Sequence, residues 1–443
     1  MLGVFYRRID VVGLERVPVH GPVIVAANHQ NGLVDPMLLM AALPRRLVPL
    51  SKAPLFRHPL LAPFLRWAGA IPVERRQDAG GAPRDNEAMF GAAFRALQHG
   101  EAILIFPEGA SQPQPALMPL HTGAARILLG AAANTTTTLE IALLPVGLHF
   151  DEPGAFRAGR ALVTIGDAVP TADCRALYAT DPAAAVRQLT DRLAAALRRE
   201  IVEAEDRETL QLVRMLEAAW REEASATADA GARAAWTRRA TRAYRYLREH
   251  APDETLRFRA DVERYAKDLE LAGISVRQVA QSYAASVAWR YTVRETLSLI
   301  LGLPLALLGI ALHIAPYQLT ALAVRILRPD ADVEATYKIF AAVVLYPLAW
   351  AWEAWLAGRV AGVVGVVVLL VALVPAGFFA LTWRDRLSRF TREVRAFLGF
   401  LADRDLRRRL ATRRRLLVIE LERLAARVPA SVLAGNGRDD RPG

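Results

Sequence analysis

The stretch "VIVAANHQNGLVDP" (Val23–Pro36) decides how the first part of the chain is expected to fold. Its five leading apolar residues predict a buried strand, and Asp followed by Pro ahead of another apolar run predicts the start of a helix. His29 and Asp35 fall in the turn between these two elements. Asp35 has two compatible interpretations: it is the N-cap of the helix, or it is the carboxylate that orients a basic His29.

The same alternation of short apolar runs and helical patterns continues through residues 1–185. Strands are predicted at Ile9–Val12, Val23–Ala27, Arg46–Leu50, Ile71–Val73, Ala102–Phe106, Ile141–Gly147 and Leu162–Ile165. Helices are predicted at Pro36–Ala42, Pro59–Trp67, Asn86–Gln98, Leu120–Leu129 and Pro182–Arg199. We therefore expect an α/β domain with a mainly parallel sheet flanked by helices. Because Pro145 cannot donate to a ladder, its strand is predicted to lie at an edge or to contain a bulge.

Two further predicted strands end in polar residues. Ile71–Val73 is followed closely by Arg75, whose planar guanidinium suits a phosphate. Ala102–Phe106 is followed by Glu108 and Gly109. Taken alone, the first pattern is more typical of a solvated charge cluster, and the second is more typical of a plain turn. In open α/β sheets, ligands bind at the carboxyl ends of the strands, so the polar strand ends together predict one site.

The remainder of the chain divides by composition. Residues 186–294 are charged and have helical spacing, with opposite charges four residues apart, as in Glu203 and Arg207. Residues 295–383 are far more apolar. Since roughly 20 apolar residues of helix span a hydrocarbon core, hydrophobic membrane segments are predicted there. They lie at about 296–324, 339–358 and 360–383.

The last part, residues 384–443, is an Arg-rich amphipathic tail with fourteen Arg against six acidic residues between Arg384 and Arg427. It is either a solvated helix or, as we favour, a helix lying on an anionic cytoplasmic leaflet. Three full crossings would put this tail opposite the N-terminal domain, against the positive-inside rule. We therefore expect Pro304 and Pro316 to break the first segment into a re-entrant pair. The other two segments should form a hairpin split at Gly358–Arg359.

Charge and cysteine content limit the classes of function. The net charge of +11 indicates anionic partners such as phospholipid head groups or phosphorylated substrates. A nucleic-acid partner is not expected, because the adjacent membrane segments account better for the basic tail. The single Cys174 excludes an intrachain disulfide and a cysteine-built zinc site. No signal peptide is visible at Met1–Arg8, so the first domain is expected to face the cytoplasm.

These motifs resemble the glycerol-3-phosphate and 1-acylglycerol-3-phosphate acyltransferase family. The four ordered blocks of that family appear here as "NHQNGLVD", "GAIPVER", "FPEG" and "LLPVG", within about residues 5–170. The five-residue gap between His29 and Asp35 is similar to the fungal-type glycerol-3-phosphate/dihydroxyacetone-phosphate acyltransferase branch. So are Ser111 in the "FPEGxS" form and the hydrophobic segments that follow the catalytic domain.

The resemblance implies roles for individual residues. His29 would deprotonate an acceptor hydroxyl, and Asp35 would hold and charge-balance the imidazole. Backbone N–H groups near these turns would stabilise the developing oxyanion. No metal or cofactor is implied. His121 stands where relatives often carry Lys. The residues implied to bind substrate are Arg75, Glu108, Gly109, Ser111 and His121.

The activity implied by the resemblance is that of a membrane-bound O-acyltransferase of phospholipid biosynthesis. A fatty acyl group would move from an acyl thioester, acyl-CoA or acyl carrier protein, to a hydroxyl of 1-acylglycerol 3-phosphate or glycerol 3-phosphate. Membrane phospholipids are the expected partners, with the catalytic domain on the cytoplasmic side of the inner membrane. The alternatives are a lysophospholipid-remodelling acyltransferase and a non-catalytic lipid-binding membrane protein.

Overall fold

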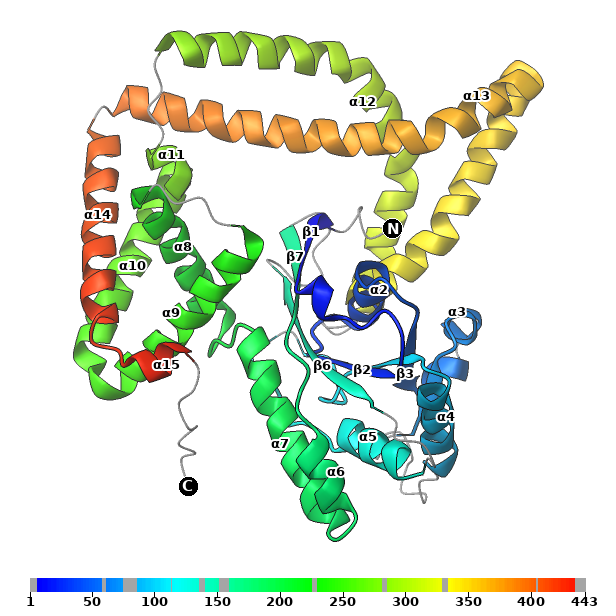
Figure 1. The fold of residues 1–443 in the computed structure, drawn as a ribbon. Helices are drawn as coiled ribbons and strands as arrows, with labels where there is room; N and C mark the ends of the chain where they lie inside the picture. The colour runs from blue at the N-terminus through cyan, green and yellow to red at the C-terminus, as the bar shows by residue number, and fades with distance from the viewer. Residues whose placement is uncertain are drawn as a thin grey trace. The chain divides into compact units, whose positions relative to one another are not determined.

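The structure is a computed structural model of the 443-residue chain, drawn as a ribbon in Figure 1. Its residues divide into two compact units. It describes residues 6–57, 61–74, 86–112, 114–134, 140–150, 159–224, 229–280, 285–328, 334–403 and 405–434. The first unit comprises Met1–Arg207, Asp229–Thr241 and Asp330–Thr336. The second comprises Glu208–Ala228, Arg242–Pro329 and Tyr337–Gly443.

The first unit is built on a seven-stranded sheet in the order β1-β7-β6-β2-β5-β3-β4. Its strands are β1 (Tyr6–Val12), β2 (Val23–Ala27), β3 (Leu47–Lys52), β4 (Ile71–Val73), β5 (Ala102–Ile105), β6 (Ala142–Phe150) and β7 (Gly159–Ile165). All neighbours pair in parallel except β6 and β7. The predicted α/β class and all seven predicted strands are therefore confirmed.

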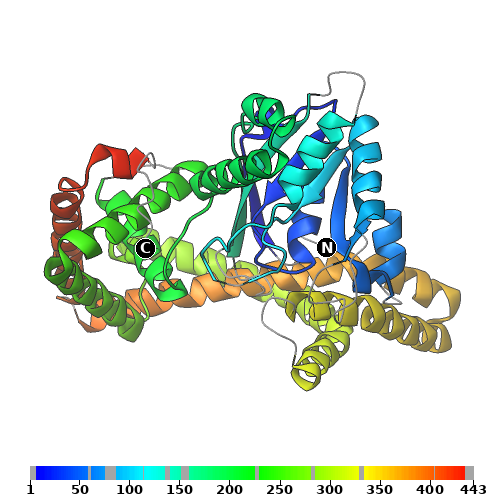
Figure 2. The same cartoon turned by 90° about the horizontal axis from the view of Figure 1, so that it is seen from below.

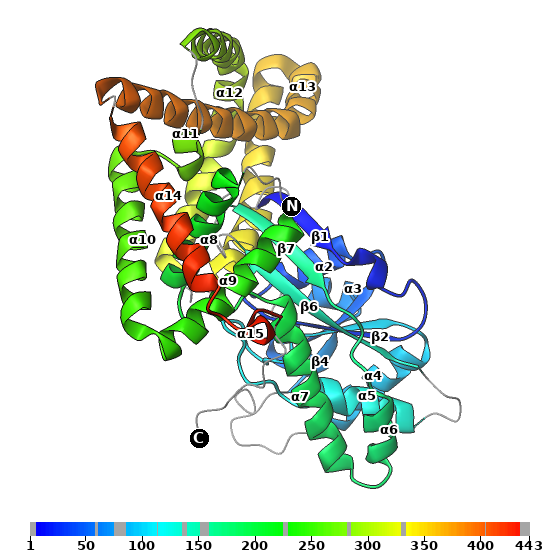
Figure 3. The ribbon, with the colours of Figure 1, turned by 60° about the vertical axis from the view of Figure 1, so that its left-hand side comes forward.

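Helices cover the sheet where the apolar patterns predict them. The predicted helices are α2 (Val34–Ala42), α3 (Leu61–Trp67), α4 (Glu87–Gln98), α5 (Gly123–Ala133) and α7 (Pro182–Glu200). Three short elements are present that the sequence patterns do not predict: η1 (Leu14–Arg16), η2 (Ala53–Arg57) and α6 (Ala172–Tyr178). Buried residues of α4, α5, α6 and α7 form one core with Ile24, Ile103 and Leu143 of the sheet. In Figure 3 these four helices gather on one side of the strands.

The position of β6 corrects the prediction for the strand that contains Pro145. This strand is interior, between β2 and β7. Pro145 pairs with Ala26 of β2, whereas pairing with β7 begins only at Val146. The N–H and C=O of one strand residue point to the same side. The Pro145 carbonyl accepts from the Gly166 N–H at the end of β7. The N–H that Pro145 lacks would point to the same side, where the pairing of β6 with β7 has already ended.

Helices also make up the predicted charged region. They are α8 (Arg207–Glu223), α9 (Ala230–His250), α10 (Pro252–Ala272) and α11 (Val276–Ala280). The start of α9 belongs to the first unit, and its C-terminal part belongs to the second together with almost all of α8 and with α10 and α11. Pro at the first position of α10 and Gly273 in the left-handed conformation after its end delimit that helix in the expected way.

Two apolar candidate membrane helices follow, α12 (Ala285–Leu327) and α13 (Glu334–Ala402). Helix α12 continues through both of its prolines, so the re-entrant pair predicted from Pro304 and Pro316 is not formed. Helix α13 is interrupted at Ala361–Gly362, where the backbone is non-helical, three residues beyond the predicted split at Gly358–Arg359. Only 17% of the most apolar window of each helix is buried, which is unlike the core helix of a soluble domain.

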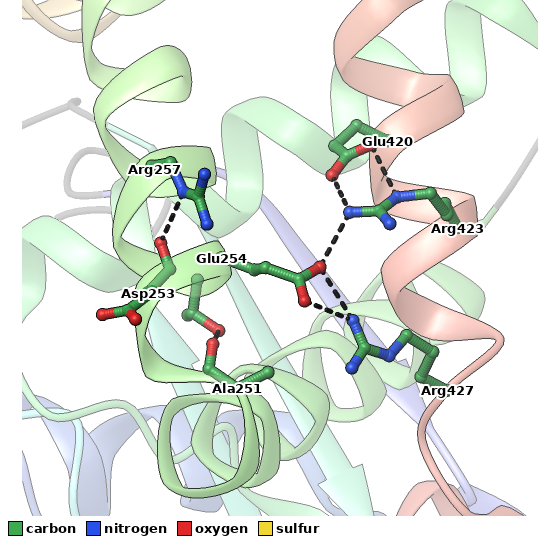
Figure 4. A network of polar contacts seen from close by, with 8 residues as sticks. Ala251, Asp253, Glu254, Arg257, Glu420, Arg423 and Arg427 are labelled. Carbon is green, nitrogen blue, oxygen red and sulfur yellow. Dashed lines mark hydrogen bonds and ion pairs between the residues drawn. The ribbon is translucent and has the colours of Figure 1, made fainter.

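The Arg-rich tail begins within α13, which ends at Ala402, and continues as α14 (Leu406–Ala425) and α15 (Ala430–Ala434). Helix α14 is amphipathic as predicted, but it lies beside α10 within the second unit (Figure 2). Leu410, Leu417 and Leu424 are buried, so the protein itself covers the apolar stripe. Arg423 and Arg427 pair with Glu254 of α10 (Figure 4). One apolar face of α14 thus has a protein partner, while Leu416 and Ile419 of the same helix are exposed, and its placement on a lipid leaflet stays a prediction.

Candidate active site

His29 and Asp35 form a hydrogen-bonded pair at the carboxyl end of β2. The distance from His29 Nδ1 to Asp35 Oδ2 is 2.9 Å, and the Asp35 side chain is completely buried. A buried carboxylate that accepts from Nδ1–H fixes the tautomer in which Nε2 carries the lone pair. The five-residue gap between the two residues therefore allows the base–orienter geometry, as the sequence predicts.

The Asp35 carboxylate organises the turn as well as the imidazole. Its Oδ2 also accepts from the backbone N–H groups of Gln30, at 2.6 Å, and Asn31, at 2.8 Å. The predicted N-cap role is wrong, because α2 begins at Val34 and Leu33 occupies the N-cap position. Asp35 lies inside the first turn and points back into the loop, so one oxygen holds both the loop backbone and the His29 ring.

The His29 ring is fixed from a second direction by Phe106. The two rings stack with centroids 4.1 Å apart and an angle of 18° between their planes. The His29 carbonyl accepts from the Gln112 N–H at 3.0 Å. Contacts from the end of β5 and from the loop after it thus fix the position of the imidazole on β2.

Glu108 connects the two loops that meet at this sheet edge. Its Oε1 accepts from the His29 N–H at 2.8 Å, and its Oε2 accepts from the Met118 N–H at 2.9 Å. The side chain is only 4% exposed. Burial raises the pKa of the Glu108 carboxyl, while the two N–H donors and the His29 charge act in the opposite direction. Glu108 holds the loops in this structure, and its predicted contact with the acceptor stays a prediction.

Gly109 allows His121 to approach the same turn. Gly109 has a φ of +71°, and a Cβ there would lie 2.6 Å from Cδ2 of His121. The His121 N–H donates to the Pro107 carbonyl at 2.8 Å. The structure therefore brings Glu108, Gly109 and His121 together, with Ser111 a few residues along the same loop. Arg75 lies outside the described residues, so its phosphate-binding role stays a prediction.

Asn28 is a residue of the site that the sequence did not single out. It is buried, its Nδ2 donates to the Leu148 carbonyl at 3.2 Å, and its Oδ1 accepts from the Leu148 N–H at 2.6 Å. This pair of bonds extends the β2–β6 ladder by one step directly before His29. An Asn at the end of an apolar strand is a recognisable signal for such a clamp.

Four backbone N–H groups of this site are already bound by the Glu108 and Asp35 carboxylates, so an oxyanion needs other donors. The N–H groups of His29 and Met118 are bound by Glu108, and those of Gln30 and Asn31 by Asp35. These four N–H groups are therefore engaged, and the expected role of other backbone N–H groups near these turns in stabilising the oxyanion stays a prediction. Within the described part of the chain, no group of three or more His, Cys, Asp or Glu residues could hold a metal ion.

The part of the chain that contains this site is similar to known proteins. Residues 8–149, which contain His29, Asp35 and Glu108, match the family model described as Acyltransferase. The chain therefore carries a domain of the acyltransferase family. The more specific resemblance to glycerol-phosphate acyltransferases is confirmed by two curated relatives from Saccharomyces cerevisiae. Its glycerol-3-phosphate O-acyltransferase 2 is 31% identical over 130 residues, and its glycerol-3-phosphate O-acyltransferase 1 is 30% identical over 135 residues.

These similarities cover only parts of the proteins. The two matches span 29% and 30% of this chain and 17% and 18% of those enzymes. An uncharacterized acyltransferase from Schizosaccharomyces pombe is 26% identical over 299 residues, which are 48% of this chain and 44% of that protein. The chain thus spans less than half of the length of these relatives. A solved structure, the 1-acyl-sn-glycerophosphate acyltransferase PlsC from Thermotoga maritima, is 19% identical with a TM-score of 0.30, covering 42% of this chain and 70% of that one.

Proposed function

We propose that the protein transfers a fatty acyl group from an acyl thioester to a hydroxyl of a glycerol-phosphate acceptor. The observation that carries this proposal is the 2.9 Å bond between His29 Nδ1 and the buried Asp35 carboxylate, at the carboxyl end of a central strand. The acyltransferase match over residues 8–149 supports it. Acyl-CoA and acyl carrier protein remain the two candidate donors.

The proposed reaction proceeds without an acyl-enzyme. His29 Nε2 takes the proton of the acceptor hydroxyl as its oxygen attacks the thioester carbonyl. Asp35 stabilises the imidazolium that forms. The tetrahedral intermediate then collapses to the new ester and expels the thiolate of the donor, which receives the proton from His29. Atoms and charge balance without any group beyond the two substrates and this histidine.

Glycerol 3-phosphate is the acceptor that we propose first, and 1-acylglycerol 3-phosphate is the second. The first choice is supported by the names of the two Saccharomyces cerevisiae relatives. Arg75, His121 and Ser111 are proposed to bind the acceptor, with Arg75 on its phosphate because a guanidinium donates two parallel hydrogen bonds.

We propose further that α12 and α13 place the enzyme in a membrane, with the catalytic unit on the cytoplasmic side. Large apolar side chains on both helices are exposed, among them Leu301 at 77% and Val363 at 80%. Water contact with so much apolar surface is unfavourable, and insertion into hydrocarbon removes it. Digestion of sealed inside-out vesicles by added protease should remove the catalytic unit, whereas its protection in such vesicles would refute this orientation.

The decisive experiment is an acyl-transfer assay on the full chain in lipid nanodiscs. Radiolabelled glycerol 3-phosphate, 1-acylglycerol 3-phosphate and other lysophospholipids are each offered with acyl-CoA or acyl carrier protein. We expect product from the wild type and none from His29→Ala. The matched control is His99→Ala, because His99 is an exposed histidine that bonds only to Arg95 in its own helix. A wild type that transfers no acyl group to any acceptor would refute the proposal.

A further inference from the structure

The loop between His29 and Asp35 has a hydrogen-bond partner from a distant part of the chain. The Leu33 N–H donates to Oγ1 of Thr336 at 3.1 Å, across 303 positions of sequence. Thr336 lies in the first turn of α13, directly after the link between the two candidate membrane helices. Glu334–Thr336 belong to the same compact unit as the sheet, whereas Tyr337 and the rest of α13 belong to the other.

Leu33 lies at the start of α2, where its N–H needs a hydrogen-bond acceptor from outside the helix. It is the N-cap of α2, and the first N–H groups of a helix have no acceptor within the helix. The loop N–H groups of Gln30 and Asn31 are bound by Asp35, and the Leu33 N–H is bound by Thr336. The start of α2, which carries Asp35, is thus held by a hydroxyl from outside the loop.

The start of α13 is itself fixed in place. Ala335, the neighbour of Thr336, is 1% exposed, and both residues belong to the first unit. Asp35 follows Leu33 by two residues, and its own N–H donates to the Asn31 carbonyl at 3.1 Å. A shift of Leu33 therefore moves the carboxylate relative to the His29 ring, to which it is bonded at 2.9 Å. Misplacement of a catalytic group by a fraction of an ångström lowers the rate of the chemical step.

We infer that Thr336 is a positioning residue for the His29–Asp35 pair, so that the first turn of α13 is part of the catalytic unit. This inference rests on the proposed acyl transfer. It has a consequence for substrate kinetics: Thr336 acts on Asp35 through Leu33, so its loss lowers kcat and leaves the KM of the acceptor unchanged.

The test compares Thr336→Val, which keeps the shape of the side chain without a hydrogen-bond acceptor, with Thr336→Ser, which keeps the hydroxyl. In nanodiscs we expect Thr336→Val to lower kcat by about 3–10-fold and Thr336→Ser to restore most of it. The matched control is Thr382→Val in the same helix, whose hydroxyl donates only to the Phe378 and Phe379 carbonyls. It should keep the wild-type kcat.

A second measurement separates this inference from the proposed function. Hydrogen–deuterium exchange of the peptide containing Leu33 needs no activity, and we expect faster exchange there in Thr336→Val than in the wild type and in Thr382→Val. Unchanged exchange and unchanged kcat in Thr336→Val would overturn the inference. So would a Thr336→Ser variant no better than Thr336→Val. A wild type without acyl transfer, but with the expected change in exchange, would refute the proposed function while leaving the contact with the loop established.

Discussion

Glu108 holds His29 by its backbone: Oε1 of Glu108 accepts the His29 N–H at 2.8 Å, while Oε2 accepts the Met118 N–H at 2.9 Å. Asp35 holds the same residue by its side chain, at Nδ1. Two buried carboxylates thus fix one histidine at two points, and they differ in what they restrain. Asp35 sets the tautomer and orientation of the ring, and Glu108 sets the position of the strand end that carries it.

Replacing Asp35 by Asn tests the side-chain restraint. The amide oxygen can take the place of Oδ2, which accepts from His29 Nδ1–H and from both loop N–H groups, but the negative charge is lost. We expect kcat to fall on the order of 10³-fold, because the imidazolium that forms has no carboxylate to stabilise it, with little change in the KM of the acceptor. Steady-state kinetics in nanodiscs measure this. Equal kcat values for the two proteins would exclude Asp35 as the orienting group.

Replacing Glu108 by Gln tests the backbone restraint. The amide keeps one acceptor oxygen but places an NH₂ group against the other backbone N–H, so either His29 or Met118 loses its partner. A hydrogen bond to a charged group contributes roughly 1.5–3 kcal/mol, so we expect a fall in kcat of about 10–100-fold. A variant with wild-type kcat would show that this bond does not position the histidine.

Titration of Glu108 should change stability and activity in opposite directions as the pH rises. Burial raises the pKa of Glu108 above the ordinary value of 4.5. The stability that comes from its protonated form is therefore fully present below pH 4.5 and is lost as the pH rises through the raised pKa. Activity should rise over that same window, because the ionised carboxylate accepts both N–H groups. Denaturant titrations and rates at several pH values should show both trends in the wild type, and Glu108→Gln should lack the part of each trend that comes from Glu108.

The sequence could predict the local parts of this site and not the distant ones. Val23–Ala27 and Ile71–Val73 are apolar runs bounded by turn residues, so both strands are found where expected. The order of the strands depends on crossovers between distant segments, which is why Pro145 alone predicts an edge or a bulge for a strand that is interior. The contact of Leu33 with Thr336 joins residues 303 positions apart, and no local pattern marks it.

Gly109 should be intolerant of a side chain for two separable reasons. Its φ of +71° strains any other residue, and a Cβ would lie 2.6 Å from His121 Cδ2. Gly21, with a φ of +84° and no atom within 4 Å of its Cβ position, has the strain without the collision. We expect Gly21→Ala to cost about 1–2 kcal/mol of stability with little effect on kcat. Gly109→Ala should also lower activity, and Gly109→Ala with His121→Ala should recover stability beyond that of the single variant. Equal losses of stability and activity in Gly21→Ala and Gly109→Ala would mean that the His121 ring moves away from the added methyl group without cost.

The last prediction concerns whether apolar contacts or exposed ion pairs hold α14 in place. Leu424 of α14 is 2% exposed and packs with Leu247, whereas the pairs of Glu254 with Arg423 and Arg427 lie at the surface (Figure 4). A buried Leu→Ala change costs about 2–5 kcal/mol, and exposed ion pairs contribute far less.

We therefore expect Leu424→Ala to speed hydrogen exchange throughout α14, and Glu254→Gln to leave it nearly unchanged. Hydrogen bonds and charge from Arg427 and Arg423 lower the pKa of Glu254, so its contribution is present above pH 4.5 and is lost as the pH falls through the lowered pKa. The part of any acid effect on α14 that comes from Glu254 should consequently be as small as the effect of Glu254→Gln. If Glu254→Gln released α14 as fully as Leu424→Ala, the ion pairs rather than the apolar stripe would be what holds the tail to α10.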